Sequence, residues 1–329
     1  MKHVMIYGTL GPACSDPNIL REMLLEGMDG IRLNLSHGTL EASKSLLEAY
    51  RSAAAACGVH PALLIDMQGP ELRIGTLDAP VSLHDGDAIG VGALPFPDTV
   101  TSALNEAAIG QEILLDDGTL LLRKEADAVL RVVRGGVLTS RKSVALPGVT
   151  IRMPALTGTD RKHIRLAKSY GVTAVMQPFV RGGADLAEVR NALNEAGAAD
   201  VRLFAKIENA EGVTHLNELI PLCDEIVIAR GDLGNAMPLW ELPAVQKRIA
   251  AACRAANRDF TVVTQMLDSM TRRPVPTRAE VSDIFNAVLD GARSVMVTAE
   301  TASGDYPVAA IRYLVKTVRE AEAYRDGLR

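Results

Sequence analysis

The sequence predicts an α/β fold: a (β/α)8 TIM barrel with a small β-barrel-like lid domain inserted after the third strand. Two patterns predict it. Short apolar runs alternate with amphipathic helical segments eight times along the chain. From about Gly75 to Pro147, this alternation is replaced by short runs between turn signals. The expected domains are therefore residues 1–72 and 150–329 for the barrel, and residues 73–149 for the lid.

Each expected strand is a short apolar run, as buried parallel strands are, and each expected helix carries apolar residues at helical spacing. The expected strands are His3–Tyr7, Gly30–Asn34, Ala62–Met67, Ala174–Phe179, Val201–Glu208, Glu225–Arg230, Thr261–Met266 and Ser294–Glu300. The expected helices are Asp16–Gly27, Leu40–Ala56, Asp160–Tyr170, Leu186–Ala196, Thr214–Leu222, Leu242–Ala256, Arg278–Leu289 and Val308–Ala323.

The interrupted interval predicts a small β domain, because turn signals such as Asp116-Asp117-Gly118 separate runs of alternating polarity. It follows a strand, so it grows from the carboxyl end of the barrel, where α/β barrels hold their active sites. We expect it to close over a ligand and exclude water. The alternative is an insertion without function.

Composition favours an ordinary globular protein, with 329 residues, 48% hydrophobic content and a net charge of −5. No apolar run reaches the roughly 20 residues that span a bilayer. The acidic balance and the 4% aromatic content give no support for nucleic-acid binding. The cysteines and histidines are scattered, so a metal would be held by carboxylates, which favours Mg²⁺ or Mn²⁺. We expect a cytoplasmic protein that binds neither nucleic acid nor membrane.

Charged residues gather where the expected strands end. Lys206 and Glu208 close one run, and Arg230 and Asp232 close the next. A surface ion pair would explain any one of these, but the pattern recurs along the chain. Cations clamp a phosphoryl group and paired carboxylates hold a divalent ion that bridges it, so the pattern favours phosphoryl transfer. Further polar residues at strand ends are Arg32, Asn34, Ser36, His37, Asp66, Arg73, Arg181, Thr264 and Glu300.

These motifs resemble, in collinear order over nearly the whole chain, those of the pyruvate kinase family. The most specific is Lys206-Ile207-Glu208-Asn209, followed by Glu211-Gly212. The others are Gly11-Pro12-Ala13, 32–38, 66–73, 229–234, 264–270, 276–280 and 286–291. The resemblance implies an α/β barrel whose third strand leads into a β lid. It also implies a short form, without the C-terminal domain that carries the family's sugar-phosphate effector site and without regulation of that kind.

The resemblance implies roles for the polar strand ends. Glu208 and Asp232 would hold Mg²⁺ or Mn²⁺. Lys206 would stabilise the phosphoryl group in transfer and the enolate oxygen that it leaves, whereas the alternative is a structural salt bridge to Glu208. Arg32 and Arg73 would hold phosphates, and Arg32 is counted with the catalytic residues.

The substrate carboxylate would be bound by backbone N–H groups around Gly231 and Asp232, with contacts from Lys206 and Thr264. The resemblance implies that Thr264 also belongs to a relay, through water, that protonates the enolate of pyruvate. A threonine hydroxyl is a poor acid alone, so it is not expected to be the sole donor. The alternative is a β-branched residue that merely ends a strand.

A monovalent-cation site is implied by four further matches. Asn34, Ser36, Asp66 and the Met67 carbonyl match the family's K⁺ ligands, and they are hard oxygen donors. Glu71 predicts K⁺ dependence, because family members with an acid at this position generally require the ion. Asn34 and His37 are also expected near nucleotide or phosphate, together with Arg32 and Arg73.

The sequence departs from the family pattern mainly on the nucleotide side. Gln68 and Ser303 stand where the family has lysines, and Ala145 stands where it has an asparagine. Pro178 replaces a small residue. The loss of two cations is expected to weaken nucleotide or phosphate binding.

Three functions remain open. The first is a pyruvate kinase that transfers a phosphoryl group from phosphoenolpyruvate to ADP, giving pyruvate and ATP, with Mg²⁺ and K⁺. The second is a paralogue acting on pyruvate or another 2-oxo acid with a different phosphate acceptor or lyase chemistry. The third is a catalytically weak member that binds a ligand or a partner. A homodimer is expected through Leu239 and Trp240, with core packing of this pair as the alternative.

Overall fold

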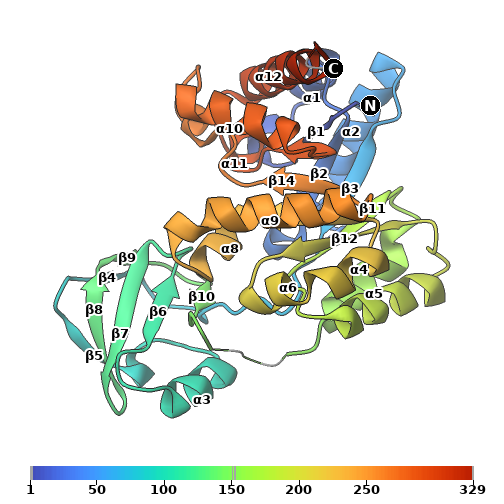
Figure 1. Ribbon diagram of the computed structural model, residues 1–329. Helices are drawn as coiled ribbons and strands as arrows, with labels where there is room; N and C mark the ends of the chain where they lie inside the picture. The colour runs from blue at the N-terminus through green and yellow to red at the C-terminus, as the bar shows by residue number, and fades with distance from the viewer. Residues whose placement is uncertain (1–2, 150, 152, 328–329) are drawn as a thin grey trace. The chain divides into compact units, whose positions relative to one another are not determined.

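The computed structural model describes residues 3–149, 151 and 153–327 (Figure 1). It divides into two compact units. The first contains the chain up to Gly69, Ala155–Arg230 and the chain from Pro243, and the second contains Pro70–Pro154 and Gly231–Leu242. The domain limits expected from the sequence stay a prediction.

The first unit is a closed barrel of eight parallel strands in the order β1-β15-β14-β13-β12-β11-β3-β2, which confirms the predicted (β/α)8 fold. The seventh and eighth strands end at Val263 and Met296, earlier than expected, and after the seventh the backbone turns left-handed at Thr264 and Gln265. The strands are β1 (Met5–Thr9), β2 (Gly30–Asn34), β3 (Ala62–Asp66), β11 (Ala174–Gln177), β12 (Arg202–Ile207), β13 (Glu225–Ala229), β14 (Asp259–Val263) and β15 (Ser294–Met296).

The helices of this unit begin and end at residues suited to capping. Asp16 accepts a hydrogen bond from the N–H of Asn18 at the start of α1, and Thr157 and Thr277 form capping boxes on α4 and α10. They are α1 (Pro17–Glu26), α2 (Lys44–Cys57), α4 (Gly158–Ala167), α5 (Gly183–Glu195), α6 (Ala210–Thr214), α7 (Leu216–Leu219), α9 (Leu242–Ala255), α10 (Arg278–Leu289), α11 (Ala299–Ala302) and α12 (Pro307–Gly327).

One expected helix, Thr214–Leu222, is wrong. The chain instead forms α6, then α7, then a 3-10 turn over Ile220–Leu222. His215 leaves the helical conformation between the first two (ψ 13°), and Pro221 supplies no N–H to continue the third.

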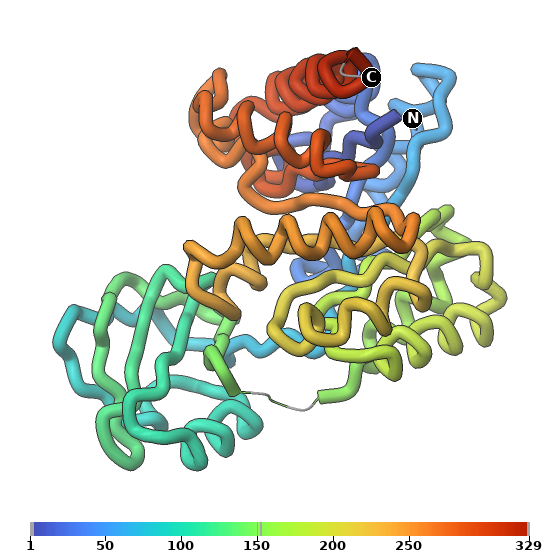
Figure 2. Tube along the Cα trace, viewed as in Figure 1, coloured from blue at the N-terminus to red at the C-terminus, as the bar shows by residue number. Residues whose placement is uncertain are grey.

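The two ends of the described chain meet on the barrel unit, as the tube in Figure 2 shows. The N–H of Val4 donates to Glu322 Oε1 on α12 at 2.7 Å. Helices α10 and α12 pack side by side over this part of the barrel (Figure 1). No helix among the described residues is both long and apolar enough to cross a membrane.

A buried carboxyl closes the amino-terminal end of the barrel. Glu225, the first residue of β13, is 1% exposed. Its Oε1 accepts hydrogen bonds from Thr261 Oγ1 at 2.6 Å and Ser294 Oγ at 2.7 Å, and its Oε2 accepts one from Arg202 at 3.0 Å. Burial raises the pKa of the Glu225 carboxyl, although the two hydroxyls and Arg202 oppose the shift.

Exchange of Glu225 for glutamine is expected to change the pH dependence of stability. Above pH 4.5, the unfolded chain releases the Glu225 proton while the folded protein still holds it. The free energy of unfolding of the wild type therefore falls with rising pH relative to Glu225→Gln, until the pH passes the raised pKa. Urea unfolding on both sides of pH 4.5 measures the difference, and parallel pH profiles would contradict it.

The second unit is built mainly of antiparallel strands. Its five-stranded sheet has the order β10-β6-β7-β8-β5, and β4 pairs with β9. A helix that the sequence did not suggest, α3 (Asp98–Glu106), accompanies the sheets. The strands are β4 (Val81–Leu83), β5 (Ala88–Gly90), β6 (Glu112–Leu115), β7 (Leu120–Ala126), β8 (Val129–Arg134), β9 (Gly136–Leu138) and β10 (Val144–Ala145).

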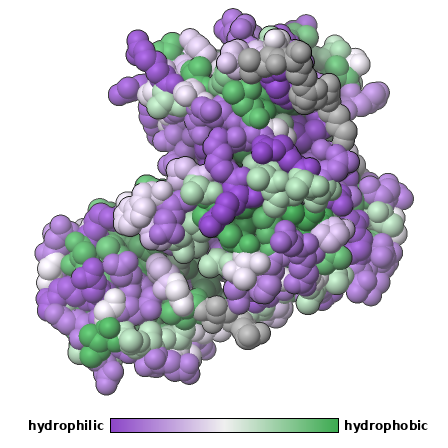
Figure 3. All heavy atoms as spheres, in the orientation of Figure 1, coloured by the Kyte–Doolittle hydropathy of each residue, from purple (hydrophilic) through white to green (hydrophobic). Residues whose placement is uncertain are grey.

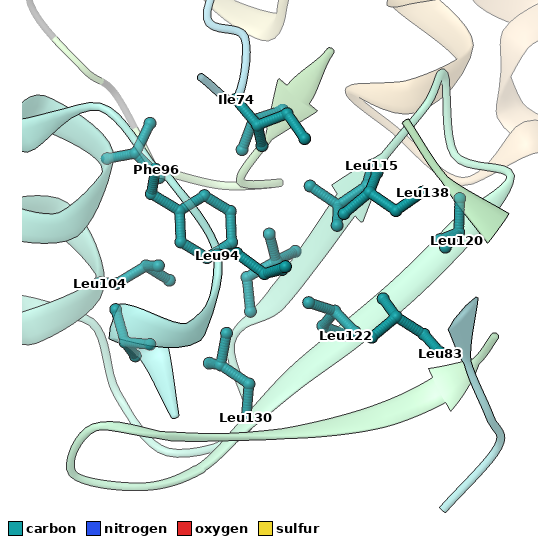
Figure 4. Packing of buried hydrophobic residues seen from close by; sticks show 14 of the residues in the cluster. Ile74, Leu83, Leu94, Phe96, Leu104, Leu115, Leu120, Leu122, Leu130 and Leu138 are labelled. Carbon is teal, nitrogen blue, oxygen red and sulfur yellow. The ribbon is translucent and has the colours of Figure 1, made fainter. Parts of the chain in front are cut away.

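This unit has its own hydrophobic core. Alternate residues of the strands, such as Leu120 and Leu122 on β7, are buried in it, and Leu104 of α3 belongs to the same cluster (Figure 4). Phe96 and Ile74 fill the core from the connecting segments. The alternation read from the sequence at residues 128–133 thus buries one face of β8, and β6 and β7 show the same period of two.

Lys124 is a buried cation in this unit, with only 3% of its surface exposed. Its Nζ donates to the carbonyls of Leu104, Asn105 and Ala107 at 2.8, 3.2 and 2.9 Å. These carbonyls lie at the carboxyl end of α3, where the helix leaves acceptors unpaired and its dipole favours a cation.

Substituting methionine for Lys124 keeps the side-chain length but leaves three acceptors without a donor. We expect the free energy of unfolding to fall by about 2–3 kcal/mol. Arg123→Met, at the exposed neighbour paired with Glu112, is the matched control and should change it by less than about 0.5 kcal/mol. Guanidinium unfolding compares the two, and equal losses would contradict a capping role.

Candidate active site

Four charged side chains meet at the carboxyl ends of barrel strands. Arg32 comes from β2, Asp66 ends β3, Lys206 lies on β12 and Glu208 follows β12 directly. Lys206 Nζ lies 3.1 Å from Asp66 Oδ2 and 2.8 Å from Glu208 Oε1. Arg32 donates from both Nε, at 2.9 Å, and a terminal nitrogen to Asp66 Oδ2. Asp66 therefore bridges the two cations.

The two carboxylates of this cluster are almost inaccessible to solvent, with Asp66 and Glu208 each 2% exposed. Burial alone would raise the pKa of Asp66, but the Lys206 ammonium and the Arg32 guanidinium outweigh it and hold that pKa below its ordinary value. Asp66 therefore carries its charge at neutral pH.

The salt bridge between Lys206 and Glu208, which the sequence offered as an alternative to a functional role, is present. This salt bridge still leaves oxygens of Glu208 and Asp66 without a hydrogen-bond donor in the described part of the chain. Glu208 Oε2 accepts the N–H of Phe179 at 2.8 Å. Glu208 Oε1 lies at ion-pair distance from Lys206 but outside hydrogen-bond geometry, and buried Asp66 Oδ1 also lacks a hydrogen-bond partner among the described residues. Both oxygens keep lone pairs, which is what a cation ligand requires.

Backbone strain marks the same end of the barrel. Phe179, Thr264 and Gln265 have φ angles of 53°, 82° and 53°. Such left-handed conformations are costly for residues other than glycine, most of all for a β-branched one, and they gather at functional sites. Thr264 is therefore not simply a residue that ends an extended strand.

Arg230 holds this strained segment. Its Nε and a terminal nitrogen donate to the Thr264 carbonyl at 3.1 and 2.6 Å, and its other terminal nitrogen binds Asp283 at 2.6 Å. The sequence placed Arg230 among cations at the mouth of the barrel. The contacts instead make it a support for Thr264.

Two other charged residues after barrel strands, Arg181 and Glu300, also bind neighbouring residues of the barrel unit. Arg181 pairs with Asp185 at 2.9 Å. Glu300 is 1% exposed, and its two oxygens accept the N–H groups of Leu267 at 3.0 Å and Thr298 at 2.6 Å. Glu300 thus fastens the loop after β14 to the loop after β15.

The residues expected to bind K⁺ lie on or after the neighbouring strands β2 and β3, with Ser36 in the 3-10 turn Leu35–His37 and Met67 directly after β3. Asn34 and Asp66 are paired in the register of these strands. Asn34 Oδ1 accepts the N–H of Ser36 at 3.1 Å, and the buried Met67 follows Asp66. An amide oxygen, a carboxylate with an unpartnered oxygen and a backbone carbonyl fit a hard cation such as K⁺.

A family model described as "Pyruvate kinase, barrel domain" matches residues 1–311. The chain belongs to the pyruvate kinase family. It is 35% identical to a pyruvate kinase of Bacillus licheniformis and 36% identical to one of Geobacillus stearothermophilus, over 98% of this chain in each case. It is 37% identical to a pyruvate kinase of Aeropyrum pernix over 95% of this chain.

The chain spans 57% and 58% of the length of the two bacillary pyruvate kinases and 69% of the Aeropyrum pernix protein. The matched residues 1–311 include the candidate cluster and the whole second unit.

Four residues to which the pyruvate kinase resemblance gives roles belong to the second unit, namely Glu71, Arg73, Gly231 and Asp232. Arg73 pairs with Glu71 at 2.7 Å and donates to the Arg141 carbonyl at 2.7 Å. Gly231 and Asp232 lie in α8 (Arg230–Asn235), the short helix that follows β13. Their part in the site stays a prediction.

Three departures from the pyruvate kinase pattern, and His37, lie at the ends of short elements or in the loop after β3. Ala145 ends β10, and Ser303 is exposed directly after α11. His37, expected near phosphate, ends the 3-10 turn Leu35–His37 and is exposed. Gln68 uses its backbone N–H to bind Asp160 at 3.1 Å.

Sequence reasoning missed Asp160 and Thr9. Thr9 Oγ1 lies 3.4 Å from a terminal nitrogen of Arg32. Asp160 was assigned only to a helix, although the pattern Thr157-x-x-Asp160 is a capping-box signal that predicts a side chain turned back toward the helix start. No local signal showed that this carboxylate also reaches the loop after β3.

Proposed function

We propose that this chain catalyses the pyruvate kinase reaction, the transfer of a phosphoryl group from phosphoenolpyruvate to ADP, which yields pyruvate and ATP. The observation that supports it most is the position of Lys206 between Asp66 and Glu208 at the carboxyl end of the barrel. Phosphoryl transfer depends on positioning and on electrostatic stabilisation, and this cluster offers both.

Lys206 supplies the positive charge for the reaction. Its ammonium stabilises the phosphoryl group in transfer and the enolate oxygen that remains, and two buried carboxylates hold it in place beforehand. Arg32 presents the fixed fork of a guanidinium to phosphate, aimed by its bonds to Asp66. In this proposal Arg73 adds a second guanidinium, and Asn34 and His37 lie near the nucleotide phosphates.

Glu208 and Asp232 are the proposed holders of Mg²⁺ or Mn²⁺. An ion held there would supply positive charge against the substrate oxygens. Carboxylate oxygens are ligands that suit Mg²⁺. Backbone N–H groups at Gly231 and Asp232 bind the substrate carboxylate.

Thr264 is proposed to contact the substrate carboxylate and to pass a proton, through water, to the methylene carbon of the enolate. Its hydroxyl only relays the proton, because its own acidity is too low for a sole donor. The clamp from Arg230 on the Thr264 carbonyl supports this assignment, since it fixes the backbone from which the hydroxyl projects.

A coupled assay with phosphoenolpyruvate, ADP, Mg²⁺ and K⁺ tests the proposal, and ATP formation is the expected result. Gln68, Ala145 and Ser303 favour keeping the second function, on pyruvate or another 2-oxo acid, as the competing outcome. Exchange of the pyruvate methyl protons with solvent, without ATP formation, would establish it, because enolisation needs Lys206 and Thr264 but no nucleotide. Ligand or partner binding without either activity would identify a regulatory member.

Potassium dependence is predicted from Asn34, Ser36, Asp66 and Met67, together with Glu71. Replacing K⁺ with tetramethylammonium at constant ionic strength is expected to lower the rate of ATP formation at least about tenfold, since the larger cation does not fit oxygen ligands. Initial rates across mixtures of the two salts measure the effect. An unchanged rate would contradict a K⁺ site.

A homodimer is proposed to form through the 3-10 turn Leu239–Glu241. Leu239 and Trp240 are 67% and 82% exposed, which rules out core packing of this pair, and aromatic residues are enriched at interfaces. On the face drawn in Figure 3, hydrophilic residues predominate and hydrophobic ones form scattered patches. The cytoplasmic location and the absence of nucleic-acid and membrane partners stay predictions.

A further inference from the structure

Asp160, on α4, is a fully buried carboxylate that contacts two separate stretches of chain. Its Oδ1 accepts the N–H groups of Gln68 at 3.1 Å and Gly69 at 3.4 Å. Its Oδ2 accepts the N–H of Thr157 at 2.9 Å and the hydroxyl of Thr157 at 2.7 Å. A buried carboxylate with four donors is a fixed point in the structure.

We propose that Asp160 is a positioning residue for the cation site, and that it does so by orienting the Met67 carbonyl. The inference rests on the proposed function, because that function assigns the Met67 carbonyl to K⁺. Asp160 itself is not a ligand in this proposal. It acts through one peptide group of the loop after β3.

Peptide geometry carries the argument. The carbonyl of Met67 and the N–H of Gln68 belong to one planar trans peptide, so they point in opposite directions. The bond from the Gln68 N–H to Asp160 therefore fixes the carbonyl direction, away from α4. On the other side, the N–H of Met67 donates to the Met176 carbonyl at 3.1 Å, so both peptides that flank Met67 are held.

The next residue restrains the same turn. Gly69 has a φ of 58°, a left-handed conformation that favours glycine, and the ring of Pro178 occupies the space that a β-carbon at Gly69 would need. The turn is thus shaped by a hydrogen bond on one side and by a proline ring on the other. Pro178, a departure from the family pattern, therefore has a structural role, which is to pack against Gly69.

The charge of Asp160 adds to the effect of its geometry. A peptide whose N–H is bonded to a carboxylate is polarised, and its carbonyl oxygen becomes a stronger acceptor. Outer partners of this kind typically change metal affinity by about 10–100-fold when they are removed. Removing Asp160 is therefore expected to weaken K⁺ binding even though every direct ligand remains.

A thermal-shift titration tests this without relying on catalysis. The melting temperature is recorded as K⁺ replaces tetramethylammonium at constant ionic strength, since a ligand that binds the folded state raises it. The K⁺ concentration for half of the rise is expected to increase about tenfold or more in Asp160→Ala, and by less in Asp160→Asn, which keeps one acceptor.

The matched control is Thr157→Val, which removes the hydroxyl that caps α4 but leaves both bonds of Asp160 Oδ1. It is expected to lower the free energy of unfolding by about 1 kcal/mol while the half-saturating K⁺ concentration stays within about twofold of the wild type. If Asp160→Ala does not fold, the half-saturating K⁺ concentration of Asp160→Asn is compared with that of the wild type instead. Equal K⁺ requirements in the Asp160 variants and Thr157→Val would reduce Asp160 to a helix cap and overturn the proposal.

The two proposals fail in different ways. A wild type that forms no ATP but shows a K⁺-specific rise contradicts the proposed reaction and leaves the role of Asp160 open to the same titration. An active wild type whose Asp160 variants keep the normal K⁺ requirement contradicts only the role of Asp160. A wild type with no K⁺-specific rise overturns the inference about Asp160 directly.

Discussion

Replacing Lys206 with methionine is expected to lower the kcat for ATP formation by about 10³-fold, because the loss of one preorganised charge from a buried site costs about 10²–10³-fold or more. The KM for phosphoenolpyruvate should change less, since this charge acts mainly on the reacting phosphoryl group and the enolate. Steady-state kinetics with saturating Mg²⁺ and K⁺ measure both constants.

The controls for Lys206 separate charge from folding. Lys206→Arg keeps the charge and the ion pairs but not the compact ammonium, so it should fold normally and still lose most of its kcat. Lys44→Met removes an exposed lysine of α2 that pairs only loosely with Glu48, at 3.9 Å, and should leave kcat unchanged. A kcat within threefold of the wild type in folded Lys206→Met would refute the catalytic assignment.

The largest loss of stability is expected from Asp66→Asn. Asp66 is 2% exposed and compensates both Lys206 and Arg32, whose side chains are 12% exposed. The neutral amide removes the charge that compensates Arg32 and leaves Glu208 as the carboxylate paired with Lys206, and breaking a buried ion pair costs about 3–5 kcal/mol. Because both cations keep some contact with solvent, we expect about 3 kcal/mol.

Urea unfolding of Asp66→Asn gives this number directly. Asp200→Asn is the control, because Asp200 is an exposed partner of Lys168 at 3.8 Å, and such pairs contribute less than about 1 kcal/mol. If the two variants lose equal stability, Asp66 does not compensate the cations as the distances indicate.

The barrel could be predicted because each of its strands and long helices is recognisable from a short stretch of sequence. Each strand is an apolar run and each long helix has its own period, so eight repeats define the closed sheet without any knowledge of contacts. The helix Thr214–Leu222 failed because its apolar pattern continues while the backbone breaks at His215 and Pro221. Periodicity reports which face is buried and not whether hydrogen bonding is continuous.

The site could be predicted in part for the same reason. Lys206, Glu208 and Asp66 lie at strand ends, and parallel strands bring their ends to one edge. The partners of those residues could not be predicted, because Arg32 meets Asp66 and Arg230 meets Thr264 only through the three-dimensional fold. The left-handed backbone at Thr264 could not be predicted either, because a β-branched residue normally avoids that conformation.

The four bonds of Asp160 have a consequence for the two ends of the inserted segment. The chain leaves the first unit after Gly69 and re-enters it at Ala155. Asp160 accepts hydrogen bonds next to both points, from Gln68 and Gly69 and from Thr157. Departure and return are therefore anchored to one carboxylate within the barrel itself. Because the segment between these two points has its own hydrophobic core, a substitution in that core acts on the stability of the segment and leaves both anchor points of the barrel in place.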